Sequence, residues 1–156
     1  MNIKPIRLKS LLFWVGTSLL AGGVSALLGG SMDKYQNLTR PPLSPPSILF
    51  PIVWGILYLL IGIGAYILSG EKNRLSETAL KFYWAQLILN SLWSLIFWRL
   101  EAFTFAAIWL ALIIFLTAVL LFLSSKINKK AFYCFLPYLL WLCFALYLNI
   151  GIAVLN

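Results

Sequence analysis

Five long apolar runs, separated by short polar segments, constrain the fold of this chain more than any other feature. Each run holds about twenty residues, which is the length an α-helix needs to cross the hydrocarbon core of a bilayer. Only 10% of the 156 residues are charged, whereas soluble domains carry about a quarter. The sequence therefore predicts an all-α membrane protein, a five-transmembrane-helix bundle that forms a single domain over residues 1–156. The predicted helices span residues 8–30, 47–69, 78–98, 102–123 and 132–154.

The first apolar run allows two interpretations. Residues 24–26 have the small-residue character of a signal-peptide cleavage site. The run continues past that site, however, and we interpret it as a retained helix. Small residues recur at every fourth position along it, which predicts a thin face where another helix can approach closely. They are Ser18, Gly22, Ala26 and Gly30. This face, or the small Ala85 and Ser91 of the third helix, is a candidate contact between two copies of the chain.

The basic residues are unevenly distributed between the loops. The formal net charge is +8, from 12 Lys and Arg against 4 Asp and Glu. No basic stripe is interleaved with polar residues, so nucleic acid is not an expected partner. Nine basic residues fall on the N-terminal side of the predicted spans and three on the other side, as the positive-inside rule describes. We predict a cytoplasmic N-terminus, with the first interhelical loop and the C-terminus on the outer side.

That first loop, residues 31–46, is rich in proline and is termed the proline loop. Proline occupies four of the six positions from 41 to 46, and each proline fixes its own φ at about −65°. The helix that follows, predicted over residues 47–69, contains Pro51 and carries Trp54 and Tyr58 on one face. We expect this stiff loop to fold over one end of the bundle and to close a pocket there.

Residues that support acid–base, nucleophilic or metal chemistry are scarce. The sequence contains no histidine, and its four acidic residues lie in predicted loops or at helix ends. A Ser-His or Cys-His pair is therefore impossible, and the sequence offers no metal-ligand motif. We predict no catalytic and no metal-binding residue. The lack of acidic or basic residues at mid-membrane depth also argues against a proton-coupled pump.

The third and fifth helices carry stripes of aromatic and amide residues. Gln86, Asn90 and Trp93 recur at helical spacing on one face. Buried amides are costly without partners, so they either bond a neighbouring helix or face a ligand in a cavity. On the fifth helix the small Ala145 leaves room beside Trp141. Together with the aromatic face of the second helix, these stripes predict an apolar small-molecule pocket with a few hydrogen-bonding groups.

Four segments in order along the chain resemble motifs of the TspO/MBR family, which includes tryptophan-rich sensory proteins and translocator proteins. The family's WYxxLxKPxxxPP loop is similar to residues 35–46 (YQNLTRPPLSPP), and its VWxxLY helix is similar to residues 53–58 (VWGILY). Its third helix resembles residues 86–97 (QLILNSLWSLIF) and its fifth resembles residues 137–149 (PYLLWLCFALYLN). The resemblance covers nearly the whole chain.

The resemblance implies a five-helix membrane bundle, often a homodimer, that binds porphyrins and other tetrapyrroles and needs no cofactor. Some members also bind sterols or synthetic benzodiazepine-type and isoquinoline ligands. The implied pocket lies beneath the proline loop, and the residue pattern adds Pro45 and Gln86 to the positions that the family motifs indicate. The predicted binding residues are Tyr35, Pro45, Trp54, Tyr58, Gln86, Asn90, Trp93, Trp141 and Ala145.

Three departures from the family pattern affect the expected ligand. Lys34 replaces a loop tryptophan, and Arg40 stands where lysine is usual. No basic residue follows Tyr147, so the L/V-x-Y-x-K/R motif of cholesterol-binding members is missing, which argues against a sterol ligand. The leading hypothesis is a tetrapyrrole-binding membrane protein with a sensory, regulatory or tetrapyrrole-handling role. The alternatives are photo-oxidative degradation of porphyrin, for which the resemblance points to Trp54 and Trp141, and a small transporter of tetrapyrroles or sterols.

The residues also predict how a tetrapyrrole is held. A haem has no histidine available as axial ligand, so binding is expected to rest on stacking against Trp54 and Trp141. Each stacked pair contributes about 0.5–1.5 kcal/mol beyond area burial. Lys34 or Arg40 is expected to pair with a propionate at the mouth of the loop. Metal-free porphyrin and open-chain bilin should then bind about as well as haem.

Overall fold

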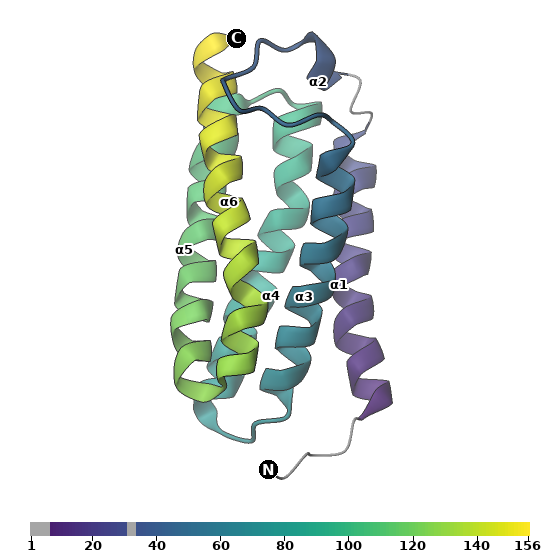
Figure 1. Cartoon of the computed structure of the whole chain (residues 1–156), viewed down its shortest axis with the longest axis vertical. Coiled ribbons are helices and arrows are strands. Elements are labelled where there is room, and N and C mark those ends of the chain that lie inside the picture. Colours follow the sequence, from purple (N-terminus) through teal and green to yellow (C-terminus); the bar gives the residue numbers. More distant parts are fainter. Residues whose placement is uncertain (1–6, 31–33) are drawn as a thin grey trace.

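The computed structural model describes residues 7–30 and 34–156, and all regular structure in those ranges is helical (Figure 1). A four-residue helix lies in the proline loop. A short π-helical turn, η1, continues the long helix that ends at Ser94. The elements are α1 (Leu8–Gly29), α2 (Lys34–Asn37), α3 (Leu49–Ser69), α4 (Arg74–Ser94), η1 (Leu95–Arg99), α5 (Phe103–Ile127) and α6 (Lys129–Leu155).

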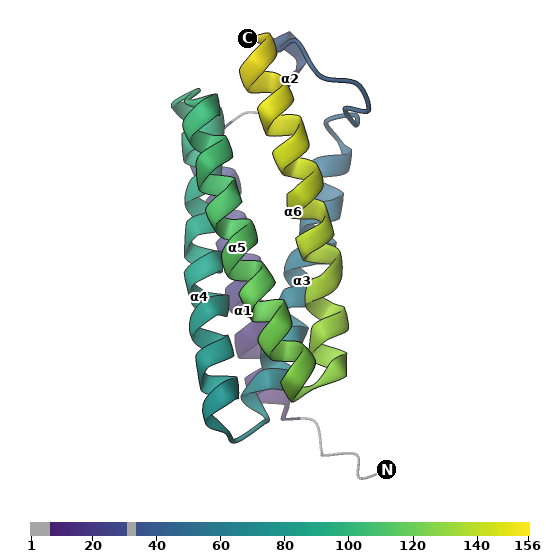
Figure 2. The same cartoon turned by 90° about the vertical axis from the view of Figure 1, so that its left-hand side faces the viewer.

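The five long helices stand side by side as an up-and-down bundle (Figures 1 and 2). Around the bundle the order is α1, α3, α6, α5 and α4, and α4 packs back against α1. One end of the bundle holds the α3–α4 and α5–α6 connections and the start of α1. The other end holds the proline loop, the α4–α5 connection and the C-terminus (Figure 1). This arrangement places the proline loop over the ends of α3, α4 and α6.

The helices confirm the predicted class of all-α membrane protein. In the described part of the chain, α1, α3, α5 and α6 are each long and apolar enough to cross a membrane. The fifth long helix, α4, is less apolar because its first turns carry Arg74, Glu77 and Lys81. Residues 7–30 and 34–156 thus contain four helices that are able to span a membrane, and α4 stays a predicted fifth span.

Several helix ends differ from the predicted ones because of capping. Helix α4 begins at Arg74 rather than residue 78, since the Asn73 side chain accepts a hydrogen bond from the Ser76 amide at 2.8 Å. Such a bond satisfies one of the N–H groups that a helix start leaves free. Helices α5 and α6 meet at Asn128, whose side chain accepts from the Lys130 amide at 3.0 Å. The lysines that end the apolar runs therefore lie within helical ends.

Of the small-residue face of α1, Ser18 and Gly22 pack inside the bundle, whereas Ala26 and Gly30 are exposed. A β-carbon on Gly62 of α3 would lie 2.7 Å from the Val15 Cα, so only glycine allows this approach of the two backbones. The Ser18 and Tyr83 hydroxyls hydrogen-bond at 2.6 Å, and Ser91 donates to a backbone carbonyl of α1 at 3.2 Å. Ser18 and Ser91, both considered as dimer contacts, are thus engaged within one chain. The homodimer itself stays a prediction.

Candidate functional site

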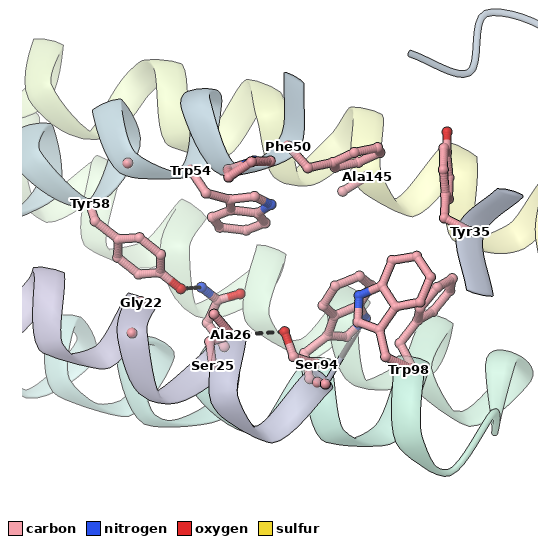
Figure 3. A pocket seen from close by; sticks show the side chains of 18 of the residues that line it. Gly22, Ser25, Ala26, Tyr35, Phe50, Trp54, Tyr58, Ser94, Trp98 and Ala145 are labelled. Atoms are coloured by element: carbon pink, nitrogen blue, oxygen red, sulfur yellow. Dashed lines mark hydrogen bonds between the residues drawn. The ribbon is translucent and has the colours of Figure 1, made fainter. Parts of the chain in front are cut away.

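A cavity of about 320 Å³ lies between α1, α3, α4 and α6 beneath the proline loop. Figure 3 shows aromatic rings pointing into it from α3 on one side and from α4 and η1 on the other. Small residues of α1 form much of the remaining wall. The aromatic lining consists of Tyr35, Phe50, Trp54, Tyr58, Trp93, Phe97 and Trp98. The predicted pocket position, under the proline loop, therefore coincides with this cavity.

The cavity brings together most of the residues that the sequence singled out. Helix α3 supplies Trp54 and Tyr58, because residues four apart lie on the same helical face. Their rings are 5.6 Å apart and tilted by 31°. The remaining predicted residues at the cavity wall come from α2, α4 and α6. They are Tyr35, Asn90, Trp93 and Ala145. The role of these residues in holding a ligand stays a prediction.

A buried hydrogen bond forms the floor of the cavity. The Asn90 side-chain amide donates to the Tyr58 hydroxyl at 2.8 Å, and both residues are buried (Figure 3). The amide thus meets a neighbouring helix and faces a cavity at the same time. Among the described residues, no hydrogen bond reaches the Asn90 carbonyl oxygen. This oxygen is therefore an acceptor that a ligand N–H group can use.

Tyr35 closes the opposite end of the cavity. Its hydroxyl donates to the Pro45 carbonyl at 2.9 Å, and its ring packs edge-on against Phe50 and Trp98 at 5.2 and 6.0 Å. Pro45 itself does not line the cavity; it acts through Tyr35, which it holds in place. The Arg40 guanidinium lies 5.0 Å over the Tyr35 ring, on the exposed side of the loop.

The proline loop is fixed to the end of α6 by close packing and hydrogen bonds. A β-carbon on Gly151 would lie 2.5 Å from the Pro41 ring, so glycine is needed where the proline rests on the helix. The Asn156 side chain accepts from the Thr39 amide and donates to the Thr39 carbonyl, both at 2.9 Å. These contacts hold the loop closed over the cavity on its α6 side.

Gln86 and Trp141, like Pro45, were predicted at the pocket but lie outside the cavity. Gln86 is fully buried and accepts a hydrogen bond from the Tyr138 hydroxyl at 2.6 Å. The Trp141 ring packs against Phe50 and a further aromatic of α6. Each lies about one helical turn from a lining residue, Asn90 or Ala145, on the side away from the loop. Gln86 therefore lies beyond the Tyr58–Asn90 pair that ends the cavity, whereas Trp141 packs behind Phe50, which lines it.

Sequence reasoning missed the contribution of α1. This helix supplies Gly22, Ser25, Ala26 and Gly29 to the wall, and Ser25 and Ser94 hydrogen-bond across it at 2.7 Å (Figure 3). A β-carbon on Gly22 would lie 2.6 Å from the Tyr58 ring. The four-residue spacing of small residues was the available signal. It was interpreted as helix packing alone, although the same lack of side chains leaves space for a cavity.

The chemistry of the wall is apolar and uncharged. No Lys, Arg, Asp or Glu lines the cavity in the described part of the chain. Its polar groups are amides, hydroxyls and indole N–H groups, and most of them are already paired. The Trp93 indole, for example, donates to the Asn149 side-chain oxygen at 3.3 Å. Residues 7–30 and 34–156 also contain no group of three or more potential metal ligands. The wall is suited to stacking against a flat apolar ring, with a few hydrogen bonds at the ring's edge.

These features define an integral membrane protein with an internal aromatic cavity beneath a proline-rich loop. A sequence model of the TspO/MBR family matches residues 13–155. The chain is 31% identical over 143 residues to the tryptophan-rich sensory protein of Cereibacter sphaeroides, covering 90% of this chain and 89% of the relative. Protein CrtK of Rhodobacter capsulatus is 34% identical over 127 residues, 78% of each chain. The translocator protein of Ovis aries is 31% identical over 130 residues, 81% of this chain and 77% of that protein.

The chain belongs to the TspO/MBR family. These three relatives come from two bacteria and a mammal, and the names of two of them describe sensing and translocation.

Proposed function

We propose that this protein binds a tetrapyrrole, whether porphyrin, haem or bilin, in the cavity under the proline loop. The observation that carries the proposal is the wall itself, in which seven aromatic residues surround about 320 Å³, with no charged side chain among the described residues that line it. A tetrapyrrole is flat, largely apolar and polar at its nitrogens. Bound in this way, the ligand supports a sensory, regulatory or tetrapyrrole-handling role in the membrane.

Stacking is the main attraction in this proposal. Trp54 offers its ring from α3, and Trp93 lies across the cavity, stacked on Phe97 at 4.9 Å and 23°. Trp93 therefore replaces Trp141 as the second stacking residue. The free carbonyl oxygen of Asn90 can accept a pyrrole N–H. Because the chain has no histidine, affinity should not depend on iron.

Titration of the purified protein with protoporphyrin IX and with biliverdin, followed by tryptophan quenching, tests this function. We expect saturable quenching by both, and an affinity for haem that is no greater than for the metal-free ring. Trp54→Ala should weaken binding about tenfold or more, because it removes a stacking surface and its buried area. Trp14→Phe is the control, since Trp14 packs against Tyr83 and Trp84 away from the cavity. A lack of quenching at micromolar ligand would refute the proposal.

Photo-oxidative degradation of bound porphyrin is a second candidate, supported by the position of Trp54 in the cavity wall. With dissolved O2 as the oxidant, a porphyrin ring excited beside an indole can be degraded without an acid, a base or a metal ion. The expected result is light-dependent loss of the porphyrin absorbance that Trp54→Phe abolishes while binding is retained. Equal loss in the wild type and in Trp54→Phe would leave binding as the only function of the site.

We also propose that α4 is a fifth membrane span, with the proline loop on the outer side. From Phe82 to Trp98 the chain has no Lys, Arg, Asp or Glu, which is enough for a tilted or slightly short span. Lys81 can extend its charge toward the interface. Leu43→Cys, Lys72→Cys and Leu100→Cys, each in a Cys134→Ser/Cys143→Ser background, place single cysteines before α3, before α4 and after η1. Positions 43 and 100 should react with an impermeant thiol reagent from the outer side, and position 72 from the cytoplasmic side. Labelling of positions 72 and 100 from the same side would refute the fifth span.

A further inference from the structure

Some residues that line the cavity are also exposed on the outside of the bundle, and all of them lie on the side formed by α1 and α3. A residue with both properties must lie where the cavity opens. All such residues belong to α1, its C-cap and α3, and none belongs to α4, η1 or α6. We term them the lateral opening. They are Leu19, Gly23, Ala26, Gly30, Pro51 and Gly55.

The lateral opening exists because α1 and α3 diverge toward the loop end. At Gly62 the two backbones touch, with an added β-carbon only 2.7 Å from Val15. Gly55 lies seven residues earlier on nearly the same face of α3, about 10.5 Å along the helix axis. A β-carbon on Gly55 would meet nothing within 4 Å, and the same holds for Gly23 on α1. The absence of side chains at these two glycines keeps the space between the helices open.

The end of the bundle beneath the proline loop is closed by comparison. Pro41 packs against Gly151, and the loop is hydrogen-bonded to Asn156. Inside the loop, Tyr35 is only 2% exposed and fills the space between Phe50 and Trp98. A ligand that entered through the proline loop would have to break these contacts. A ligand that entered through the lateral opening would break none of these contacts.

The lateral opening faces lipid. Both α1 and α3 are long and apolar enough to span the membrane. The outward side chains beside the opening are apolar, including Leu27 at 82% exposed and Ile52 and Ile56 at about half exposed. A molecule dissolved in the bilayer therefore meets the opening directly, at the depth of the hydrocarbon core.

We propose that the ligand passes between the bilayer and the cavity through the lateral opening, and not through the proline loop. The proposal deepens the proposed function and rests on it. It restricts the ligand class to flat molecules that partition into the membrane, because the passage is flanked by glycines and admits a ring edge-first. The loop then acts as a fixed cap, and the exchange rate depends on the space at Gly23 and Gly55.

Exchange kinetics test this route. Protein in phosphatidylcholine vesicles is mixed with protoporphyrin IX, and tryptophan quenching is followed in a stopped-flow instrument; release is followed by chase with apomyoglobin. Gly55→Leu and Gly23→Leu place a side chain in the opening without a clash at Cβ. A narrowed passage should slow association and release by the same factor, about tenfold or more. An altered binding contact would instead change mainly the release rate.

Two control variants separate the routes. Gly16→Leu adds the same side chain to α1 at a glycine that has no neighbour within 4 Å and does not line the cavity, and it should leave both rates unchanged. Asn156→Ala loosens the proline loop and should also leave them unchanged. Faster exchange in Asn156→Ala together with wild-type rates in Gly55→Leu would overturn the proposal, although tetrapyrrole binding would stand. If the wild type showed no quenching, both proposals would fall.

Discussion

The contact between α1 and α3 at Gly62 allows a sharp test, because a matched glycine lies two turns away on the same helix. In Gly62→Ala, the new β-carbon would lie 2.7 Å from the Val15 Cα and 3.0 Å from the Trp14 carbonyl oxygen. Carbons in contact prefer about 3.5–4.0 Å, so the helices must separate by about 1 Å. Both neighbours are backbone atoms and cannot rotate away. Overpacking of this kind costs about 1–3 kcal/mol.

Gly55→Ala is the control, because its β-carbon meets nothing within 4 Å. Both substitutions add the same methyl group and the same gain in helix propensity, about 1 kcal/mol, so that contribution cancels. We expect Gly62→Ala to be less stable than Gly55→Ala by about 1–3 kcal/mol, and Gly55→Ala to be at least as stable as the wild type. The measurement is SDS-induced unfolding in mixed micelles, followed by far-UV circular dichroism. Equal unfolding free energies for the two variants would refute the close approach of α1 and α3.

Two further outcomes follow from hydrogen bonds in the structure. Asn156→Ala removes the hydrogen bond to the Thr39 amide, and such a bond contributes about 0.5–1.5 kcal/mol. Hydrogen exchange of the Thr39 amide, measured by NMR, should therefore accelerate about 2–13-fold. Unchanged hydrogen exchange would show that the loop is held elsewhere. Gln86→Leu leaves the buried Tyr138 hydroxyl without its acceptor and should cost about 1–3 kcal/mol. Adding Tyr138→Phe should recover most of that loss, and an additive double variant would contradict the pairing.

The sequence predicted the existence of the helices better than their ends. Apolar runs identify spans because each must be about twenty residues long, and all five predicted runs are helical. Helix ends depend instead on single caps. Asn73 starts α4 four residues before the apolar run, and the lysines near Asn128 remain helical because their charges reach water from helix ends. A hydropathy pattern does not contain that information.

The sequence indicated which helix faces form the candidate site, but not where along the helices the cavity ends. Periodicity assigned Asn90 and Trp93 to the cavity face of α4, because residues three and four apart share a face. It could not show that the Tyr58–Asn90 bond ends the cavity before Gln86, or that Trp141 packs behind Phe50. The α1 wall was missed for a different reason. A glycine shows in a sequence that a side chain is absent, but not whether a neighbouring helix or empty space takes its place.

The single residue between α5 and α6 has a mechanical consequence. Asn128 alone joins them, ending one helix and capping the next, so the pair forms a hairpin with no slack in its connection. The two helices pack along their length, and the proline loop is attached to the far end of α6 through Gly151 and Asn156. Hairpin and loop should therefore move as one stiff unit. Any breathing of the bundle is then expected where this unit meets α3 and α4, rather than between α5 and α6.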